Sequence, residues 1–127
     1  MSKEEIVNAE ITDTFLGIER GFLTFNIFCE FTDSLGKWIC SFGGSSLGVY
    51  DDNSFESYHH ASELIYRILD CVGVNSWETL KGKLVRIRTN GLTGCAGGIL
   101  AIGNILEDKW LSLYGFYLSR KGDNNEW

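Results

Sequence analysis

Apolar and polar side chains alternate most clearly along residues 22–31, which predicts a β-strand. The alternation places five apolar side chains on one face: Leu23, Phe25, Ile27, Cys29 and Phe31. The opposite face is also partly apolar, because Phe22 and Phe28 fall on it. We therefore expect that this second face is covered, either by a helix or by a partner subunit.

Four further segments have strand patterns: residues 6–13 (continuing toward 18), 37–42, 84–90 and 98–106. Residues 19–21 form a turn with Arg20 at its centre, and residues 32–36 form a hairpin loop. The run at 99–102 is apolar on both faces, which favours a central strand.

A single long helix is predicted over residues 53–72. Asn53 caps its start and Gly73 ends it. Its apolar stripe consists of Ala61, Leu64, Ile65, Ile68 and Val72. The aromatic segment 108–120 forms a short helix or an irregular stretch, and residues 121–127 form a frayed tail. These elements predict one α+β domain over residues 1–127, with an antiparallel sheet of about five strands packed on one main helix.

Composition restricts the function classes. A chain of 127 residues with a net charge of −6 and a pI near 4.8 lacks the basic footprint of a DNA- or RNA-binding protein. No stretch approaches the length of a membrane span, and the first residues resemble no signal peptide. The four cysteines form no Cys-x-x-Cys pair, so we expect reduced thiols and a cytoplasmic protein. Cys29 and Cys40 face each other across a hairpin in this scheme, where buried thiols are favoured over a disulfide.

No set of residues indicates catalysis or a metal site. His59 and His60 are the only histidines, and adjacent helix positions diverge by about 100°. Acidic pairs are common on an acidic surface and do not by themselves indicate acid–base chemistry. We therefore expect a binding protein that has no cofactor and is not an enzyme.

Cationic and aromatic residues point to an anionic ligand. Arg86 and Arg88 alternate with apolar residues and share one strand face, where a planar guanidinium fork matches phosphate or carboxylate. The alternative is a solvated face paired with the many carboxylates of the chain. The glycine-rich run from Gly43 is either a phosphate cradle or an ordinary turn. Arginine for phosphate and an aromatic ring for a base suit a nucleotide. The candidate ligand-binding residues are Arg20, Phe42, Gly43, Gly44, Arg86, Arg88, Asn90, Lys109 and Trp110.

Five stretches in order resemble a family of small phage proteins: GIERGFLTF (17–25), FGG (42–44), RILD (67–70), VNSWETLKGK (74–83) and GNILEDKW (103–110). The chain resembles the Thoeris anti-defence "sponges", which sequester cyclic ADP-ribose signals without degrading them. The resemblance implies a non-enzymatic homo-oligomer in the host cytoplasm, with nucleotide signals held at subunit interfaces. Some members of that family are also held to capture cyclic oligonucleotides.

Two alternatives stay open. The acidic chain is an inhibitor that contacts a host defence protein directly, in the manner of an anti-CRISPR protein, or it is a phage accessory protein without a ligand.

Overall fold

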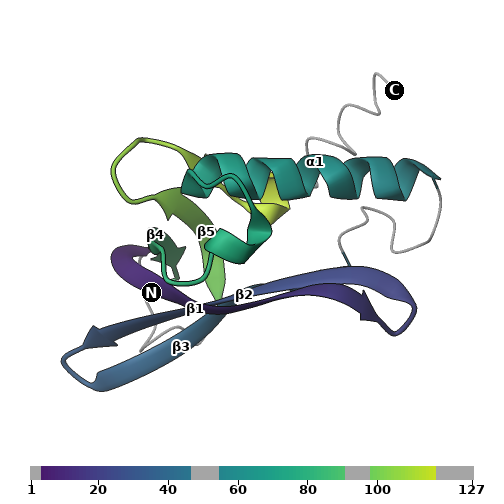
Figure 1. Ribbon diagram of the computed structural model, residues 1–127. Helices are drawn as coiled ribbons and strands as arrows, with labels where there is room; N and C mark the ends of the chain where they lie inside the picture. The colour runs from purple at the N-terminus through teal and green to yellow at the C-terminus, as the bar shows by residue number, and fades with distance from the viewer. Residues whose placement is uncertain (1–3, 47–54, 91–97, 117–127) are drawn as a thin grey trace.

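The computed structural model describes residues 4–46, 55–90 and 98–116. Within them, six strands and one long helix form a single α+β arrangement, which confirms the predicted fold class with six strands in place of about five (Figure 1). The elements are β1 (Glu5–Glu19), β2 (Phe22–Asp33), β3 (Gly36–Ser46), α1 (Phe55–Val72), the 3-10 turn η1 (Trp77–Thr79), β4 (Leu84–Thr89), β5 (Ile99–Asn104) and β6 (Trp110–Leu111).

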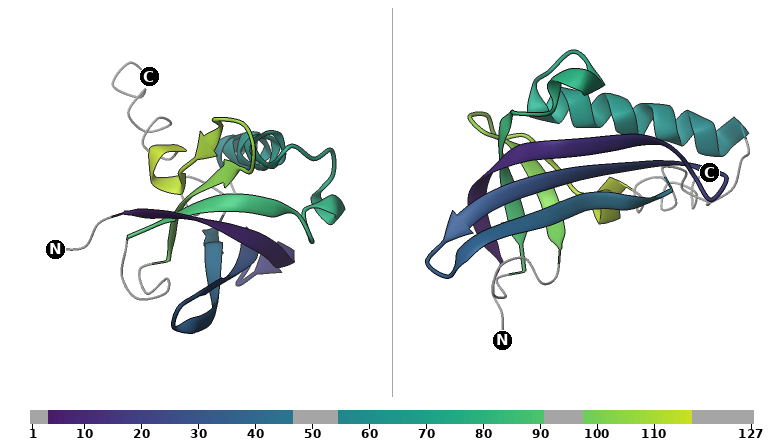
Figure 2. Two further views of the ribbon diagram at one scale, coloured as in Figure 1. Left: turned by 90° about the vertical axis from the view of Figure 1, so that its left-hand side faces the viewer. Right: turned by 60° about the horizontal axis from the view of Figure 1, so that its bottom comes forward.

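The strands form one antiparallel sheet in the order β3-β2-β1-β4-β5-β6. The long strand β1 joins its two halves. Residues 5–10 of β1 pair with β4, and residues 10–19 pair with β2. The register shifts between Ile11 and Asp13, so Thr12 forms a bulge where β1 passes from one partner to the other. The sheet bends strongly along this line, as the two views of Figure 2 show.

The core lies between α1 and the inner face of the sheet (Figures 1 and 2). The strand β2 contributes Phe25, Ile27, Cys29 and Phe31, all of them buried as the alternation predicts. Helix α1 contributes Ala61, Leu64, Ile68 and Val72, with Ile65 packed beside them. The prediction of a central strand at 99–102 is confirmed, because β5 lies between β4 and β6 and its Ala101 and Ile102 are fully buried.

The turn between β1 and β2 is confirmed at Arg20 and Gly21, which have φ angles of 56° and 84°. Positive φ at both central residues is typical of a type I′ hairpin turn. Asp33 organises the next hairpin, where its Oδ1 accepts hydrogen bonds from Leu35 N, Gly36 N and the indole N–H of Trp38. The indole contact, together with the backbone N–H groups, lowers the pKa of Asp33.

The glycine-rich segment after Phe42 does not form the predicted turn. Strand β3 continues through it to Ser46, with a bulge opposite Thr24 and Asn26. Gly43 has φ 106°, and a Cβ atom there would lie 2.7 Å from the Phe25 ring. The glycine is therefore required by a close approach within the sheet.

Beyond residue 108, the structure agrees only in part with the predicted short helix or irregular stretch. The chain forms the short edge strand β6 and then a helical turn over residues 113–116. The predicted tail at 121–127 and the start of the predicted helix at 53–54 lie outside the described residues.

The bonding state of the cysteines differs in part from the prediction. Cys29 and Cys40 are cross-strand neighbours in β2 and β3, as predicted, but they are not bonded to each other. Cys29 and Cys71 are free, whereas Cys40 is disulfide-bonded. The expectation of reduced thiols is therefore wrong for Cys40, and cysteine usage no longer argues for a reducing compartment. Cys95 lies outside the described residues.

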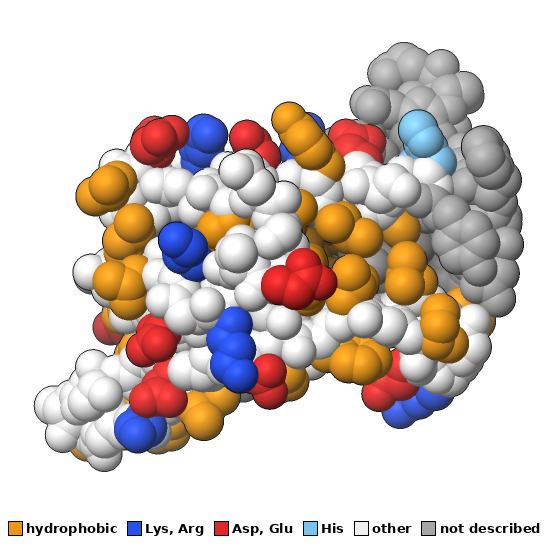
Figure 3. All heavy atoms as spheres, viewed as in Figure 1, with side chains coloured by type: hydrophobic (Ala, Val, Ile, Leu, Met, Phe, Trp, Pro, Cys, Tyr) orange, Lys and Arg blue, Asp and Glu red, His pale blue; other side chains and the backbone are white. Residues whose placement is uncertain are grey.

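The described surface mixes acidic and basic side chains, and apolar side chains gather between α1 and the strands below it (Figure 3). Several large apolar residues are well exposed: Ile6, Ile18, Ile39, Leu84 and Leu106. Among the described helices, none combines the length and the apolar character needed to cross a membrane.

Candidate functional site

Arg86, Arg88 and Trp110 form a cationic cluster on the face of the sheet that points away from the core. In β4, the buried residues Val85 and Ile87 alternate with the two half-buried arginines. Arg86 pairs with Gly103 of β5, and Gly103 pairs with Trp110 of β6, so the three strands bring the side chains together. The guanidinium carbons of Arg86 and Arg88 lie 4.8 Å and 5.7 Å from the centroid of the Trp110 ring. Both guanidinium groups therefore make cation–π contacts with one indole.

Trp110 can lie flat on the sheet only because residue 103 is a glycine. A Cβ atom on Gly103 would come within 2.7 Å of the six-membered ring of Trp110. The indole thus has the Gly103 backbone on one side and guanidinium groups beside it. It supports the two arginines, and stacking of a ligand base on this ring stays a prediction.

Arg86 is held by backbone carbonyl groups. Its Nε donates to Asn104 O at 2.7 Å, and its Nη2 donates to Glu107 O at 2.8 Å. These contacts fix the orientation of the guanidinium without neutralising its charge. A guanidinium held in this way is preorganised for an anion, because little side-chain freedom remains to be lost on binding.

Asn104 fixes the turn that supplies those carbonyls. Its Oδ1 accepts hydrogen bonds from Leu106 N and Glu107 N, both at 2.9 Å. Its Nδ2 donates to Cys71 O and Val72 O, the carbonyls at the end of α1. Asn104 therefore connects the C-terminus of the helix, the turn and the orientation of Arg86.

Arg88 is less completely satisfied. Glu4 Oε1 lies 3.1 Å from Arg88 Nε, which makes an ion pair. The carboxylate lies off the direction of the N–H group, so this buried Nε has no hydrogen-bond partner. The Glu4 carboxylate is 60% exposed, so solvent weakens the ion pair. Arg88 therefore retains donor capacity for an incoming acceptor.

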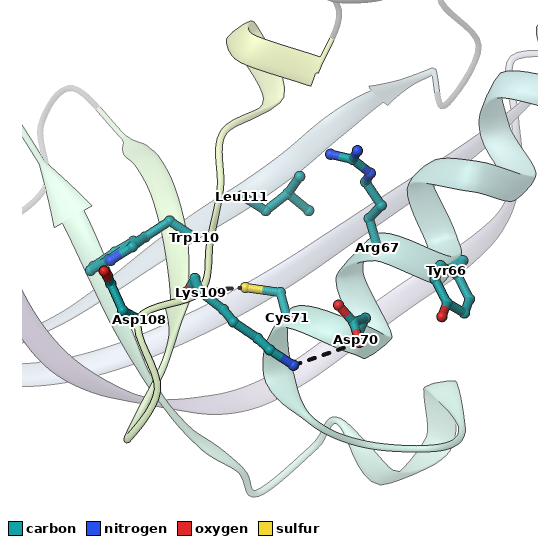
Figure 4. A pocket seen from close by; sticks show the side chains of 8 residues that line it. All are labelled: Tyr66, Arg67, Asp70, Cys71, Asp108, Lys109, Trp110 and Leu111. Carbon is teal, nitrogen blue, oxygen red and sulfur yellow. Dashed lines mark hydrogen bonds and ion pairs between the residues drawn. The ribbon is translucent and has the colours of Figure 1, made fainter.

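A cavity of about 510 Å³ adjoins the cluster at the seam between α1 and β6 (Figure 4). Its lining residues are Tyr66, Arg67, Asp70, Cys71, Asp108, Lys109, Trp110 and Leu111. Lys109 extends across the seam, where its Nζ lies 3.7 Å from Asp70 and 3.6 Å from Glu107. Arg67 lies 3.7 Å from Glu63 on the same helix. Both basic side chains on this wall thus have carboxylate partners.

The cavity contains no activated nucleophile among the described residues. The Cys71 thiol lies close to the carbonyl oxygens of Ile102 and Lys109, at 3.5 and 3.6 Å. Burial, and secondly the charge of Asp70, raise the pKa of Cys71 to about 11, so the thiol stays protonated at neutral pH. Burial raises the pKa of Cys29 to about 12. The described residues also contain no cluster of three or more His, Cys, Asp or Glu side chains suited to a metal ion.

The structure separates the predicted ligand-binding residues into two groups. Arg86, Arg88 and Trp110 come together; Lys109 neighbours Trp110 but extends to α1, and Asn90 follows directly after β4.

The remaining four do not join this site. Arg20 lies at the far tip of the β1–β2 hairpin, about 40 Å of strand beyond the position of β1 that faces Arg86. Phe42 is a core residue with 1% exposure, and Gly43 and Gly44 belong to β3 at the opposite edge of the sheet. Within one chain, the nine candidate residues therefore do not lie together.

Sequence reasoning missed Glu4, Gly103 and Asn104. Gly103 and Asn104 lie in one of the stretches that carry the family resemblance, but their contacts depend on the pairing of β5 with β6. The partnership of Glu4 with Arg88 depends on the pairing of β1 with β4, which joins two segments that are far apart in the sequence. Comparison with protein-family models, curated proteins and solved structures finds no match to this chain.

Proposed function

We propose that this protein binds a phosphate-bearing nucleotide signal and sequesters it without chemical change. The observation that carries the proposal is the pair of guanidinium groups on Trp110, one oriented by backbone carbonyls and one ion-paired only with the exposed Glu4 carboxylate among the described residues. Two adjacent positive charges repel each other, and a phosphate between them relieves that repulsion while accepting charge-assisted hydrogen bonds.

The resemblance to the Thoeris anti-defence family narrows the ligand to cyclic ADP-ribose isomers, with cyclic oligonucleotides as a second class. In this proposal the protein acts for a phage in the host cytoplasm. The high pKa of the Cys71 thiol in the adjoining cavity agrees with a site that holds a ligand and does not cleave it. The 510 Å³ cavity is of a size suited to a small-molecule ligand.

Ultrafiltration tests the proposal. The chain is incubated with each cyclic ADP-ribose isomer, the protein is retained on the filter, and the ligand in the filtrate is quantified. We expect depletion of one isomer from the filtrate, and release of that isomer with unchanged mass when the retained protein is heated. The double variant Arg86→Gln/Arg88→Gln should leave the ligand in the filtrate. Lys81→Gln/Lys83→Gln is the matched control, because it removes the same charge from two exposed side chains elsewhere.

Each other outcome points to a different function. A ligand of altered mass would identify an enzyme. No depletion with any cyclic ADP-ribose isomer or cyclic oligonucleotide would reject sequestration. A filtrate that still activates the host effector, combined with co-purification of a host protein, would favour direct inhibition through the acidic surface.

A further inference from the structure

The β1–β2 hairpin carries a second cavity on the sheet face opposite α1. The cavity has a volume of about 260 Å³ and is lined by Phe15, Glu19, Thr24, Asn26 and Phe28. Phe28 belongs to the face for which the sequence predicts a cover, either a helix or a partner subunit. Helix α1 packs on the other side of the sheet and does not supply that cover (Figure 2).

This cavity is separate from the arginine cluster and opposite to it in charge. Phe15 lies seven residues along β1 from Asn8, the residue that pairs with Arg86. At roughly 3.3 Å per residue, this separation is about 23 Å along the strand. The described lining of the cavity includes the Glu19 carboxylate and no basic residue. A ligand of this cavity therefore differs in charge from a phosphate-bearing ligand.

The strands themselves leave the space over Thr24 and Asn26 unfilled. Thr24 pairs with Gly17, which has no side chain, and a Cβ atom on Gly17 would lie 3.0 Å from the Phe15 ring. On the other side of β2, the register with β3 shifts between Thr24 and Asn26, which marks a bulge. Phe15 lies directly across from Asn26, and Phe28 lies two residues further along β2. The two aromatic side chains therefore stand beside a polar floor.

The polar groups of this floor and wall are mainly hydrogen-bond acceptors. Asn26 Oδ1 is buried without a hydrogen-bond partner, which is rare for a native polar atom. The terminal torsion of asparagine is soft, so the amide can turn this oxygen toward a donor in the cavity. The Thr24 hydroxyl donates to Phe22 O at 3.1 Å and keeps its lone pairs for another group. Glu19 forms no ion pair with another described residue. The complementary occupant is therefore a cation that supplies N–H donors.

The aromatic walls select among the possible cations. A quaternary ammonium group stacks on aromatic rings but has no N–H group for Asn26 or Thr24. A primary ammonium group has donors, but it is compact and strongly hydrated, so its transfer from water is costly. A guanidinium group is planar and more weakly hydrated, stacks on aromatic faces and carries a fork of N–H donors. The cavity volume lies below the range typical of drug-sized ligands, so the occupant is small.

We propose that this cavity is a binding site for a guanidinium group. The planar cation stacks on Phe15 and Phe28, the Glu19 carboxylate opposes its charge, and its N–H groups donate to Asn26 Oδ1 and Thr24 Oγ1. Binding supplies the partner that the buried amide oxygen lacks, which distinguishes this cavity from an ordinary surface hollow. The site takes a ligand of its own and does not depend on the nucleotide ligand.

Calorimetric titration of the full chain with agmatine, a small guanidinium compound, tests the site. We expect saturable binding of one agmatine per chain. Putrescine, which has an ammonium group in place of the guanidinium, should bind at least about tenfold more weakly. A Gly-Arg-Gly peptide with blocked ends is the second probe. Binding of agmatine alone identifies a free small molecule as the ligand, and binding of the peptide identifies an arginine side chain. No binding of either probe, or equal binding of putrescine and agmatine, would overturn the proposal.

Two substitutions locate the bound cation. Glu19→Gln should weaken agmatine binding about tenfold, because it removes a charge-assisted contact. Glu78→Gln is the matched control; it removes an exposed carboxylate from η1 and should bind as the wild type does. Asn26→Leu should abolish binding without lowering the urea midpoint, since it replaces a buried amide that has an unpartnered oxygen. Unchanged affinity in Glu19→Gln or in Asn26→Leu would refute the site. Arg86→Gln/Arg88→Gln should bind agmatine normally, and weaker binding there would place the cation elsewhere.

Discussion

Arg86 and Trp110 are joined by a cation–π contact in which the guanidinium carbon lies 4.8 Å from the ring centroid. The two residues come from different strands and meet only through the intervening β5. The contact makes the edge strand β6 part of the arginine cluster, although β6 is only two residues long. The stability of this edge and the orientation of Arg86 therefore depend on the same arrangement of three strands.

Replacing Trp110 should weaken that edge. Trp110→Leu keeps an apolar side chain over Gly103 but removes the π face that attracts both guanidinium groups. We expect the free energy of unfolding to fall by about 1–2 kcal/mol, measured by urea denaturation. Tyr114→Leu, at a side chain that is 75% exposed, should have a much smaller effect. Equal midpoints for Trp110→Leu and wild type would show that the contact contributes nothing.

A methyl group at Gly103 should displace the indole. Gly103→Ala places a Cβ atom within 2.7 Å of the Trp110 ring, and we expect a loss of about 1–3 kcal/mol from overpacking. Gly115→Ala is the matched control, because its Cβ would meet nothing closer than 3.6 Å. The double variant Gly103→Ala/Trp110→Leu should lose less than the sum of the single losses. Additive losses would refute the predicted clash.

Glu4 should compete with any anion for Arg88. Glu4→Gln removes the carboxylate that lies 3.1 Å from Arg88 Nε, so affinity for a phosphate-bearing ligand should rise severalfold in calorimetry. Glu5→Gln removes a neighbouring exposed charge and should change affinity much less. Raising the salt concentration should narrow the difference between the variants, since exposed charges are screened. Lower affinity in Glu4→Gln would mean that Glu4 positions Arg88 for the ligand.

Asn104→Asp should destabilise the chain in a pH-dependent way. The substitution keeps the acceptor for Leu106 N and Glu107 N but replaces the donor to Cys71 O and Val72 O by a carboxylate. A negative charge at a helix C-terminus is unfavourable, and we expect a loss of about 2 kcal/mol at pH 7. Protonation of the new carboxyl group restores a donor, so the difference from wild type should shrink as pH falls. A difference that is constant between pH 7 and pH 4 would contradict this mechanism.

The buried thiols predict a loss of stability in alkali. The pKa values of Cys71 and Cys29 rise to about 11 and about 12 from an ordinary value of 9.0. Because the folded state holds these protons more tightly than the unfolded state, their contribution is complete below pH 9 and is lost as pH rises toward 11. Each thiol should lower the free energy of unfolding by about 1 kcal/mol at pH 10. Urea titrations from pH 7 to 10 measure this effect, and Cys71→Ala should flatten the curve.

Local patterns predict most of the fold. The alternation at 22–31 and the stripe on α1 identify buried faces correctly, because each reports one element packing against a single core. The sequence pattern ends this strand at Phe42 and not at Ser46, because glycine and serine usually indicate a turn. At Gly43, however, the glycine serves a bulge against Phe25, and this is a tertiary contact that no local pattern contains.

The site was only half predictable. Strand alternation places Arg86 and Arg88 on one face, and the structure agrees. Residue type alone suggests Phe42 and Arg20 as ligand-binding residues. In the structure, Phe42 is buried in the core and Arg20 lies at the distant tip of the β1–β2 hairpin. The support from Gly103, Asn104 and Glu107 depends on the path of the chain after β5, which single-strand patterns do not specify.

The division of β1 between two partners has a consequence for the order of folding. The pairs β1–β2 and β2–β3 are hairpins whose strands are separated by short turns, so they can form early. The β1–β4 pair closes a loop that contains both hairpins and the whole of α1, and we expect the entropy of that closure to make it the slow step. Until it closes, β4 has no partner on the β1 side. The strands β4, β5 and β6 can bring Arg86, Arg88 and Trp110 together without β1, whereas Glu4 reaches Arg88 only once the β1–β4 pair has formed.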